Sequence, residues 1–165
     1  MPRLPGRLGT LTARDVMTER LVVLHEADLL PHAAQVLREQ RISGAPVVNA
    51  SGEVAGMLSL SDLIGHGQEP WLSSSSQADA AFPNGWSELC RRVEQSASAQ
   101  TVADRMTRNV MTVWEATPIT EVARILCDGH WHRVPVISAA GKLTGIVSAM
   151  DLLAALVQAQ DEAGI

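Results

Sequence analysis

Residues 56–62, Gly-Met-Leu-Ser-Leu-Ser-Asp, and residues 145–151, Gly-Ile-Val-Ser-Ala-Met-Asp, are two copies of one pattern. They lie 89 residues apart, and the same offset aligns residues 12–64 with residues 101–153 without a gap. An internal repeat constrains a fold more strongly than any single motif. This repeat predicts two similar units that pack about a pseudo-twofold axis and form two related clefts.

Hydrophobic patterning predicts the order strand, helix, strand, strand, helix in each copy. The first copy is expected to have a strand over residues 21–24, a helix capped by Asp28, a hairpin over residues 45–58 and a helix opened by Ser61.

The second copy predicts the same elements. They are a strand over residues 110–113, a helix with Thr117 as N-cap and Pro118 at its first position, a hairpin over residues 134–147 and a helix over about residues 149–160.

The fold class is therefore expected to be α/β (α+β), with two β-α-β-β-α repeats packed through their sheets. Each repeat is too short to be comfortably stable alone, so a shared core is expected. The expected divisions are an N-terminal arm at 1–11, a first domain at 12–66, a linker at 67–100, a second domain at 101–160 and a tail at 161–165.

The linker contains an amphipathic helical stripe. Trp86, Leu89, Cys90 and Val93 follow the spacing i, i+3, i+4, i+7. Two interpretations remain open: the helix packs on the repeats, or it docks a partner protein.

Composition limits the class of protein. The net charge of −5 argues against nucleic acid as the main partner, because phosphate-binding proteins usually carry a basic face. No stretch of 18 apolar residues exists, so no membrane insertion is expected, and the first ten residues lack the apolar core of a signal peptide. Cys90 and Cys127 are widely spaced, which favours two free thiols and a cytoplasmic location.

The repeated motif has two interpretations. Ser59-x-x-Asp62 and Ser148-x-x-Asp151 have the form of a capping box that opens a helix. The same groups could hold a nucleotide, because a hydroxyl at a helix start can receive a phosphate and a carboxylate can accept ribose hydroxyls. Gly56 and Gly145 would then let the ligand approach the backbone, or they simply relieve crowding in a strand.

Other chemistry has less support. His130 and His132 share one face of a strand, but no third ligand has suitable spacing, so no metal site is expected. No nucleophile with a base and an orienting acid is evident, so no catalytic residue is predicted.

Four motifs together resemble one known family. They are Asp15-Val-Met17-Thr18, Ala45-Pro-Val-Val48, His132-Arg-Val-Pro-Val136 and the duplicated Gly-x-x-Ser-x-x-Asp. In order and in two copies, they resemble the cystathionine-β-synthase (CBS) domain. The resemblance implies a tandem module that senses adenosyl ligands such as AMP, ADP, ATP or S-adenosylmethionine. It also implies association of two modules into a disc-shaped dimer.

The resemblance also implies which residues bind the nucleotide. They are the hydroxyls of Ser59 and Ser148, the ribose-binding carboxylates of Asp62 and Asp151, the phosphate-binding pair His132 and Arg133, the adenine-lining residues Val22, Val23, Met111 and Thr112, and the backbone at Gly56 and Gly145. The first copy departs from the pattern, because Ser43 and Gly44 stand where the second copy has His132 and Arg133. The two clefts are therefore expected to be unequal.

The sequence thus predicts a stand-alone, non-catalytic sensor of adenosyl ligands that acts on an unknown effector protein. The alternative is a structural module for dimerisation or partner docking, with no nucleotide bound. A homodimer is expected because apolar helical faces would otherwise lack cover. These faces carry Leu30, Ala33, Leu37, Leu152 and Leu156.

Overall fold

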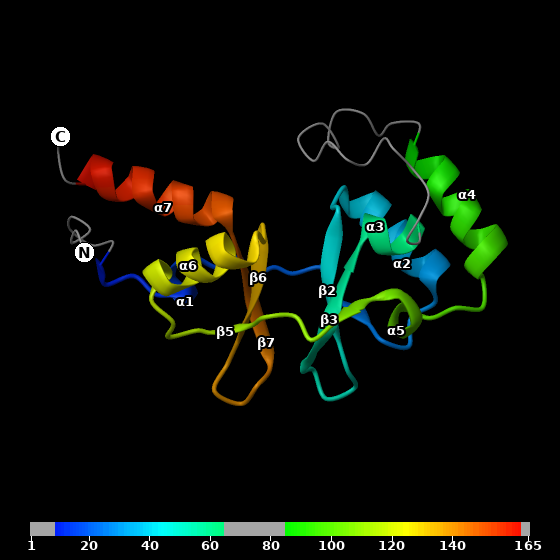
Figure 1. The fold of residues 1–165 in the computed structure, drawn as a ribbon, viewed down its shortest axis with the longest axis horizontal. Helices are drawn as coiled ribbons and strands as arrows, with labels where there is room; N and C mark the ends of the chain where they lie inside the picture. The colour runs from blue at the N-terminus through cyan, green and yellow to red at the C-terminus, as the bar shows by residue number, and fades with distance from the viewer. Residues whose placement is uncertain (1–8, 65–84, 163–165) are drawn as a thin grey trace. The chain divides into compact units, whose positions relative to one another are not determined.

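Both copies have the predicted order of strand, helix, strand, strand, helix (Figure 1). The computed structural model describes residues 9–64 and 85–162, with side chains described as far as 159. The first copy comprises β1 (Leu24–His25), α2 (Leu30–Gln40), β2 (Gly44–Val48), β3 (Val54–Ser59) and α3 (Leu60–Ile64). The second comprises β5 (Val113–Trp114), α6 (Ile119–Gly129), β6 (Arg133–Ile137), β7 (Leu143–Ser148) and α7 (Ala149–Glu162).

Four further elements lie outside this pattern. They are α1 (Ala13–Val16), α4 (Gly85–Ala97), α5 (Val102–Arg105) and β4 (Thr107–Arg108). Each copy has its own sheet, with the strand orders β1-β2-β3-β4 and β5-β6-β7. In each sheet the first strand runs parallel to the second, with Leu24 opposite Val47 and Val113 opposite Val136. The helix between these two strands makes the crossover that a parallel pair requires.

The chain divides into two units that exchange their opening segments. The first-repeat unit contains residues 22–50, 55–64 and 85–110; the second-repeat unit contains residues 9–21, 51–54 and 111–162. Each short opening helix, α1 or α5, therefore belongs to the unit formed by the other repeat.

Backbone hydrogen bonds hold each opening segment in place. In the second-repeat unit, Ala13 N–H donates to Thr117 O at 2.8 Å. In the first-repeat unit, Val102 N–H donates to Asp28 O at 2.8 Å. The exchange is thus the same in both units.

The first strand of each copy, β1 or β5, is shorter than predicted. Strands were expected over residues 21–24 and 110–113, but the structure has only Leu24–His25 and Val113–Trp114. A strand needs hydrogen bonds to a neighbouring strand. Only these residues of β1 and β5 pair with β2 and β6.

The predicted helix N-caps were also wrong. Leu29 caps α2 and Pro118 caps α6, each one residue after the predicted cap. The Asp28 carboxylate accepts the His25 N–H at 2.8 Å, and the Thr117 hydroxyl accepts the Trp114 N–H at 3.0 Å. Both side chains therefore close the turn that precedes the helix.

The linker helix α4 packs on the first repeat, which confirms the first of its two interpretations. Its stripe places Leu89, Val93 and Ala97 in one buried cluster with the apolar faces of α2 and α3. Leu30 and Leu37 of α2 are 1% and 0% exposed. The expectation that this helical face needs cover from a second chain was therefore wrong, because α4 covers it.

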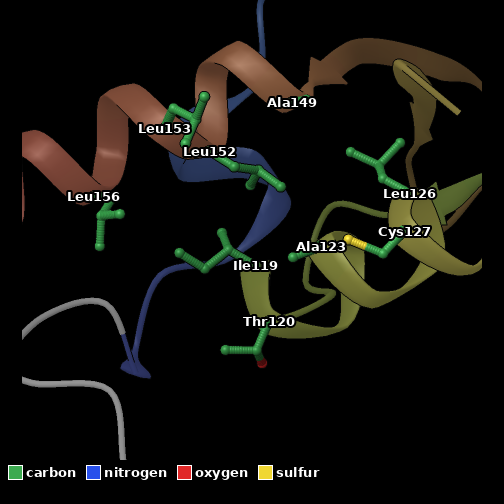
Figure 2. A pocket seen from close by; sticks show the side chains of 9 residues that line it. All are labelled: Ile119, Thr120, Ala123, Leu126, Cys127, Ala149, Leu152, Leu153 and Leu156. Carbon is green, nitrogen blue, oxygen red and sulfur yellow. The ribbon is translucent and has the colours of Figure 1, made fainter. Parts of the chain in front are cut away.

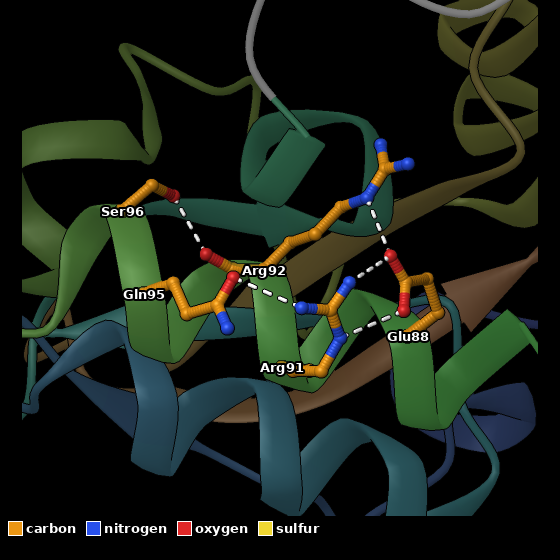
Figure 3. Close-up of polar contacts among 5 residues, drawn as sticks. All are labelled: Glu88, Arg91, Arg92, Gln95 and Ser96. Atoms are coloured by element: carbon orange, nitrogen blue, oxygen red, sulfur yellow. Dashed lines mark hydrogen bonds and ion pairs between the residues drawn. The ribbon is translucent and has the colours of Figure 1, made fainter.

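The opposite face of α4 is polar (Figure 3). Glu88 forms ion pairs with Arg91 at 2.6 Å and with Arg92 at 3.0 Å. Hydrogen bonds from these two arginines lower the pKa of Glu88 to about 2. The pairs are exposed, so the packing of α4 depends mainly on its apolar face.

The second repeat has a smaller core and a more exposed helix. Val113, Val122, Val134, Val136 and Val147 are buried between the sheet and α6. On α7, the large apolar residues Met150, Leu153, Leu156 and Val157 are 70%, 52%, 47% and 58% exposed. Among the described residues, no helix is long and apolar enough to cross a membrane.

Candidate functional site

The first-repeat unit presents its Ser–Asp motif where β3 turns into α3. The Asp62 Oδ2 atom accepts the Ser59 N–H at 2.7 Å and the Ser59 hydroxyl at 2.8 Å. Both residues are half-buried. The Thr107 hydroxyl of β4 lies 3.4 Å from Asp62 Oδ1, a long and weak hydrogen bond. One carboxylate oxygen is thus engaged by the motif, and the other has only this weak partner.

The second-repeat unit repeats this geometry where β7 turns into α7. The Asp151 Oδ2 atom accepts the Ser148 N–H at 2.7 Å and the Ser148 hydroxyl at 2.6 Å. The Asp151 N–H in turn donates to the Ser148 hydroxyl at 3.2 Å, which completes a capping box. No described residue forms a hydrogen bond with Asp151 Oδ1.

The two motif glycines lie against the opening segments. A Cβ on Gly56 would collide with the Thr107 carbonyl oxygen, and one on Gly145 would lie 3.0 Å from the Met17 Cβ and closer still to the rest of that side chain. Such close approach supports the crowding interpretation for both glycines.

Threonine residues from the opening segments also come close to the motif, which the sequence did not predict. Thr107 pairs with Met57 across the sheet, and Thr18 forms the matching backbone bridge with Ile146. The sequence signal for these contacts is the duplicated Met-Thr pair. It does not indicate which copy of the Ser–Asp motif each threonine approaches.

The positively charged pair lies beside the second motif. Arg133 is the register partner of Ser148, and the His132 carbonyl accepts the Ala149 N–H at 3.0 Å. The side chains of His132 and Arg133 are exposed. No hydrogen bond or ion pair to a described residue engages the Arg133 guanidinium.

The equivalent place in the first-repeat unit holds no charge. A Cβ on Gly44 would lie 2.9 Å from the Leu58 carbonyl oxygen and 3.3 Å from the Ser59 Cα. Gly44 therefore sits directly beside Ser59, where a larger residue would collide with the backbone. In the first-repeat unit this position of β2 thus leaves no room for a charged side chain, whereas Arg133 occupies the equivalent position opposite Ser148 in the second.

The predicted adenine-lining residues fall in the segments before the first strand of each copy. Val22 and Val23 are half-buried and precede β1. Met111 is 48% exposed, Thr112 is half-buried, and both precede β5. Val22 and Val23 belong to the first-repeat unit, and Met111 and Thr112 belong to the second-repeat unit.

Two more capping boxes resemble the site but open the short helices α1 and α5. The Asp15 carboxylate accepts the Thr12 N–H and hydroxyl, and Asp104 does the same for Thr101. The backbone hydrogen bond is the main cause that lowers the pKa of each carboxyl. The spacing Thr-x-x-Asp could have revealed both helices from the sequence.

Metal-binding side chains do not converge in the described residues. No group of three His, Cys, Asp or Glu residues there could hold an ion. His130 ends α6 in a left-handed conformation, and His132 precedes β6.

Comparisons with known proteins agree with the fold and the motifs. The CBS domain model matches residues 13–69 and 102–158. The chain is 29% identical over 167 residues to the CBS domain-containing protein CBSX2, chloroplastic, of Arabidopsis thaliana, covering 96% of this chain and 68% of the relative. It is 30% identical over 155 residues to protein MJ1426 of Methanocaldococcus jannaschii, covering 87% of this chain and 90% of that protein.

A solved structure extends the comparison to a bound state. The crystal structure of CBSX2 in complex with AMP superposes with a TM-score of 0.65 at 27% identity, covering 89% of this chain and 96% of that one. The two matched domains account for most of the described residues, and their repeated fold is the one seen here. The chain therefore belongs to the CBS-domain family as a tandem pair of CBS domains.

Proposed function

We propose that this protein is a regulatory CBS-pair module that binds an adenosyl ligand, AMP, ADP, ATP or S-adenosylmethionine, and that it is not an enzyme. The observation that carries the proposal is the duplicated Ser–Asp motif, held in the same geometry in both units. The AMP complex of a relative that is 27% identical supports an adenosyl ligand.

The capping and ribose-binding roles of the aspartates are compatible. In both units the motif's serine donates to Oδ2 alone. The Oδ1 atoms of Asp62 and Asp151 remain able to accept hydrogen bonds from ribose hydroxyls. A charged carboxylate accepts such a bond more strongly than a neutral oxygen does. The cap would also fix the carboxylate before the ligand arrives, which reduces the entropy cost of binding.

The remaining site residues have proposed roles that follow the sequence prediction. His132 and Arg133 would contact a phosphate, because the exposed guanidinium has no described partner. The segments containing Val22, Val23, Met111 and Thr112 would line the adenine. We propose no ligand contact for Gly56 and Gly145, since the chain itself occupies the space beside them.

A ligand panel tests the proposal. At a concentration of 100 times its dissociation constant, a ligand that binds only the folded protein adds about 2.7 kcal/mol of stability. For a chain of this size the melting temperature should rise by about 5 to 10 °C. The measurement is thermal unfolding with AMP, ADP, ATP and S-adenosylmethionine, with GMP as a control that has the same ribose and phosphate as AMP but a different base. The absence of a shift with all four adenosyl compounds at millimolar concentration would contradict the proposal.

The second candidate is a structural dimerisation or docking module without a nucleotide. The exposed apolar residues of α7 favour it, because large exposed apolar patches mark interaction surfaces. In that case replacing Ser148 by alanine would remove only a cap, at a cost of about 1 kcal/mol, and no adenosyl compound would change the melting temperature.

The output and location belong to the same proposal. A non-catalytic sensor acts through an effector protein or through its own assembly. Cys90 and Cys127 are both free thiols in the structure, which suits the proposed cytoplasmic location.

A further inference from the structure

Trp131 presents an aromatic ring at the surface of the second-repeat unit. Its side chain is 43% exposed and is not part of the apolar clusters that the described residues of this unit form. A Cβ on Gly129 would lie 2.5, 2.6 and 2.7 Å from the atoms Cδ2, Cε3 and Cε2 of the indole. These atoms surround the fusion of the two rings, so the indole lies flat over Gly129. One face of the ring is therefore covered by a glycine while the side chain stays open to solvent.

The first copy has a different pair of residues at these two positions. Gln40 and Ile42 align with Gly129 and Trp131. Ile42 is half-buried and packs against the apolar core of the first repeat. An aliphatic residue is thus sufficient to complete the fold at this position. The packing of the repeat therefore does not explain an exposed indole with a glycine beneath it.

Trp131 lies at the edge of the second sheet that carries the candidate site. It directly precedes β6, whose first residue, Arg133, is the register partner of Ser148 at the end of β7. Strands β5 and β6 are parallel, so they begin at this same edge. The segment that contains Met111 and Thr112 precedes β5 and reaches the edge as well. The indole is thus close to the groups proposed to bind the nucleotide.

Backbone hydrogen bonds hold Trp131 beside the proposed phosphate-binding pair. The Trp131 N–H donates to the Leu126 carbonyl at 2.9 Å, and the carbonyl of the next residue, His132, accepts the Ala149 N–H at 3.0 Å. The Cα atoms of Trp131 and Arg133 are at most about 7.6 Å apart, because consecutive Cα atoms are about 3.8 Å apart. A nucleotide whose phosphate meets the Arg133 guanidinium can therefore reach Trp131 with its base.

An apolar pocket of about 350 Å³ between α6 and α7 does not compete for this ligand (Figure 2). None of the nine residues that line the pocket is an acid, a histidine, a lysine or an arginine. A phosphate bound there would lose its hydration without gaining a charged partner, which is costly. The exposed edge beside Arg133 suits a nucleotide better.

We propose that Trp131 stacks on the base of the nucleotide in the second-repeat unit, and that Gly129 positions the ring for this contact. The inference rests on the proposed function and deepens it, because it assigns the base to the unit that contains Arg133. Stacking of a base on an aromatic side chain is a strong contact that needs only an accessible ring face. The first-repeat unit has neither an aromatic residue nor a cation at the equivalent positions, Ile42 and Gly44, so it should bind a nucleotide more weakly.

Isothermal titration calorimetry of the full chain with AMP tests the proposal. Trp131→Leu supplies an aliphatic side chain like that of Ile42 but no aromatic face, and it should raise the AMP dissociation constant roughly 5- to 150-fold. Trp131→Phe keeps an aromatic ring and should lose less than about 5-fold. Trp114→Leu is the matched control. Trp114 is 53% exposed in the same unit but pairs with Ile137 at the other end of β6, so its replacement should leave the affinity unchanged.

Three further measurements separate stacking from a structural role. Ribose 5-phosphate has the sugar and phosphate of AMP but no base, so its affinity should be the same in Trp131→Leu and in the unsubstituted protein. AMP should quench the indole fluorescence of the unsubstituted protein and of Trp114→Leu, and Trp131→Leu should lose this quenching. Gly129→Ala keeps Trp131 but puts a methyl group where the ring lies, so it should weaken the binding of AMP and not that of ribose 5-phosphate.

Two results would overturn the proposal. One is an AMP dissociation constant that does not change in Trp131→Leu, which would leave the proposed function intact. The other is an equal loss of affinity for AMP and for ribose 5-phosphate, which would give Trp131 a structural role. If the unsubstituted protein binds none of the four adenosyl compounds, the proposed function and this inference are both wrong.

Discussion

Asp62→Ala and Asp151→Ala are each expected to weaken the binding of an adenine nucleotide by roughly 10- to 150-fold, and by unequal factors. A lost hydrogen bond to a charged group costs about 1.5 to 3 kcal/mol, and each 1.4 kcal/mol is a factor of ten. The losses should differ because the second repeat carries His132 and Arg133 where the first has no charged side chain. Isothermal titration calorimetry with AMP measures both constants.

The two other capping boxes provide matched controls. Asp15 shares a unit with Asp151, and Asp104 shares a unit with Asp62. Both carboxylates accept the same pair of bonds from a threonine. Asp15→Ala and Asp104→Ala should therefore lower the melting temperature slightly and leave the affinity for AMP unchanged.

Two results would count against this explanation. Equal losses of affinity in Asp62→Ala and Asp151→Ala would contradict the predicted inequality of the sites. An affinity that falls as much in Asp15→Ala as in Asp151→Ala would show that helix capping, and not contact with ribose, controls binding.

Long apolar patterns were sufficient to predict the main elements. The hairpins β2–β3 and β6–β7 and the helices α2, α6 and α7 lie where the periodicity placed them, because their apolar faces are long enough to be unambiguous. The cap positions were wrong by one residue. Asp28 and Thr117 each accept the N–H of the residue three positions before them and so close a turn. In sequence, such a residue looks the same as a helix N-cap, and only the backbone conformation distinguishes the two roles.

Non-local contacts could not be derived from the repeat. Residues 12–18 and residues 101–107 align in sequence, but each segment packs in the unit formed by the other repeat. Periodicity describes one element at a time and does not specify which sheet a short segment joins. The stripe of α4 was predictable, but which repeat it covers was not, because both repeats offer equivalent apolar helices.

In the candidate site, too, local motifs were predictable from the sequence and non-local contacts were not. The Ser–Asp pairs were predictable because each is a local motif. The environment of Gly56 and Gly145 depends on Thr107 and Met17, which lie about fifty and more than a hundred residues away in the chain. The sequence therefore left open whether these glycines serve a ligand or the packing, and the structure supports packing.

The exchange of opening segments leads to a second large effect. Gly56→Ala is expected to lower the free energy of unfolding by about 3 kcal/mol or more, and Gly145→Ala by about 1 to 2 kcal/mol. At Gly56 the new methyl group would meet the backbone carbonyl of Thr107, which is fixed by its pairing with Met57. At Gly145 it would meet the side chain of Met17, whose sulfur and Cγ can rotate away.

Urea denaturation of the full chain measures both changes. Gly9→Ala is the control, because no atom lies within 4 Å of the added methyl group, and its effect should be near zero. Gly56→Ala should also loosen β4, since its pairing with β3 includes Gly56 opposite Arg108. Faster amide exchange in residues 101–108 would report this loss. Equal destabilisation by Gly56→Ala and Gly145→Ala would contradict the distinction between a rigid and a flexible neighbour, and no destabilisation by either would contradict the close packing of the opening segments on the motif glycines.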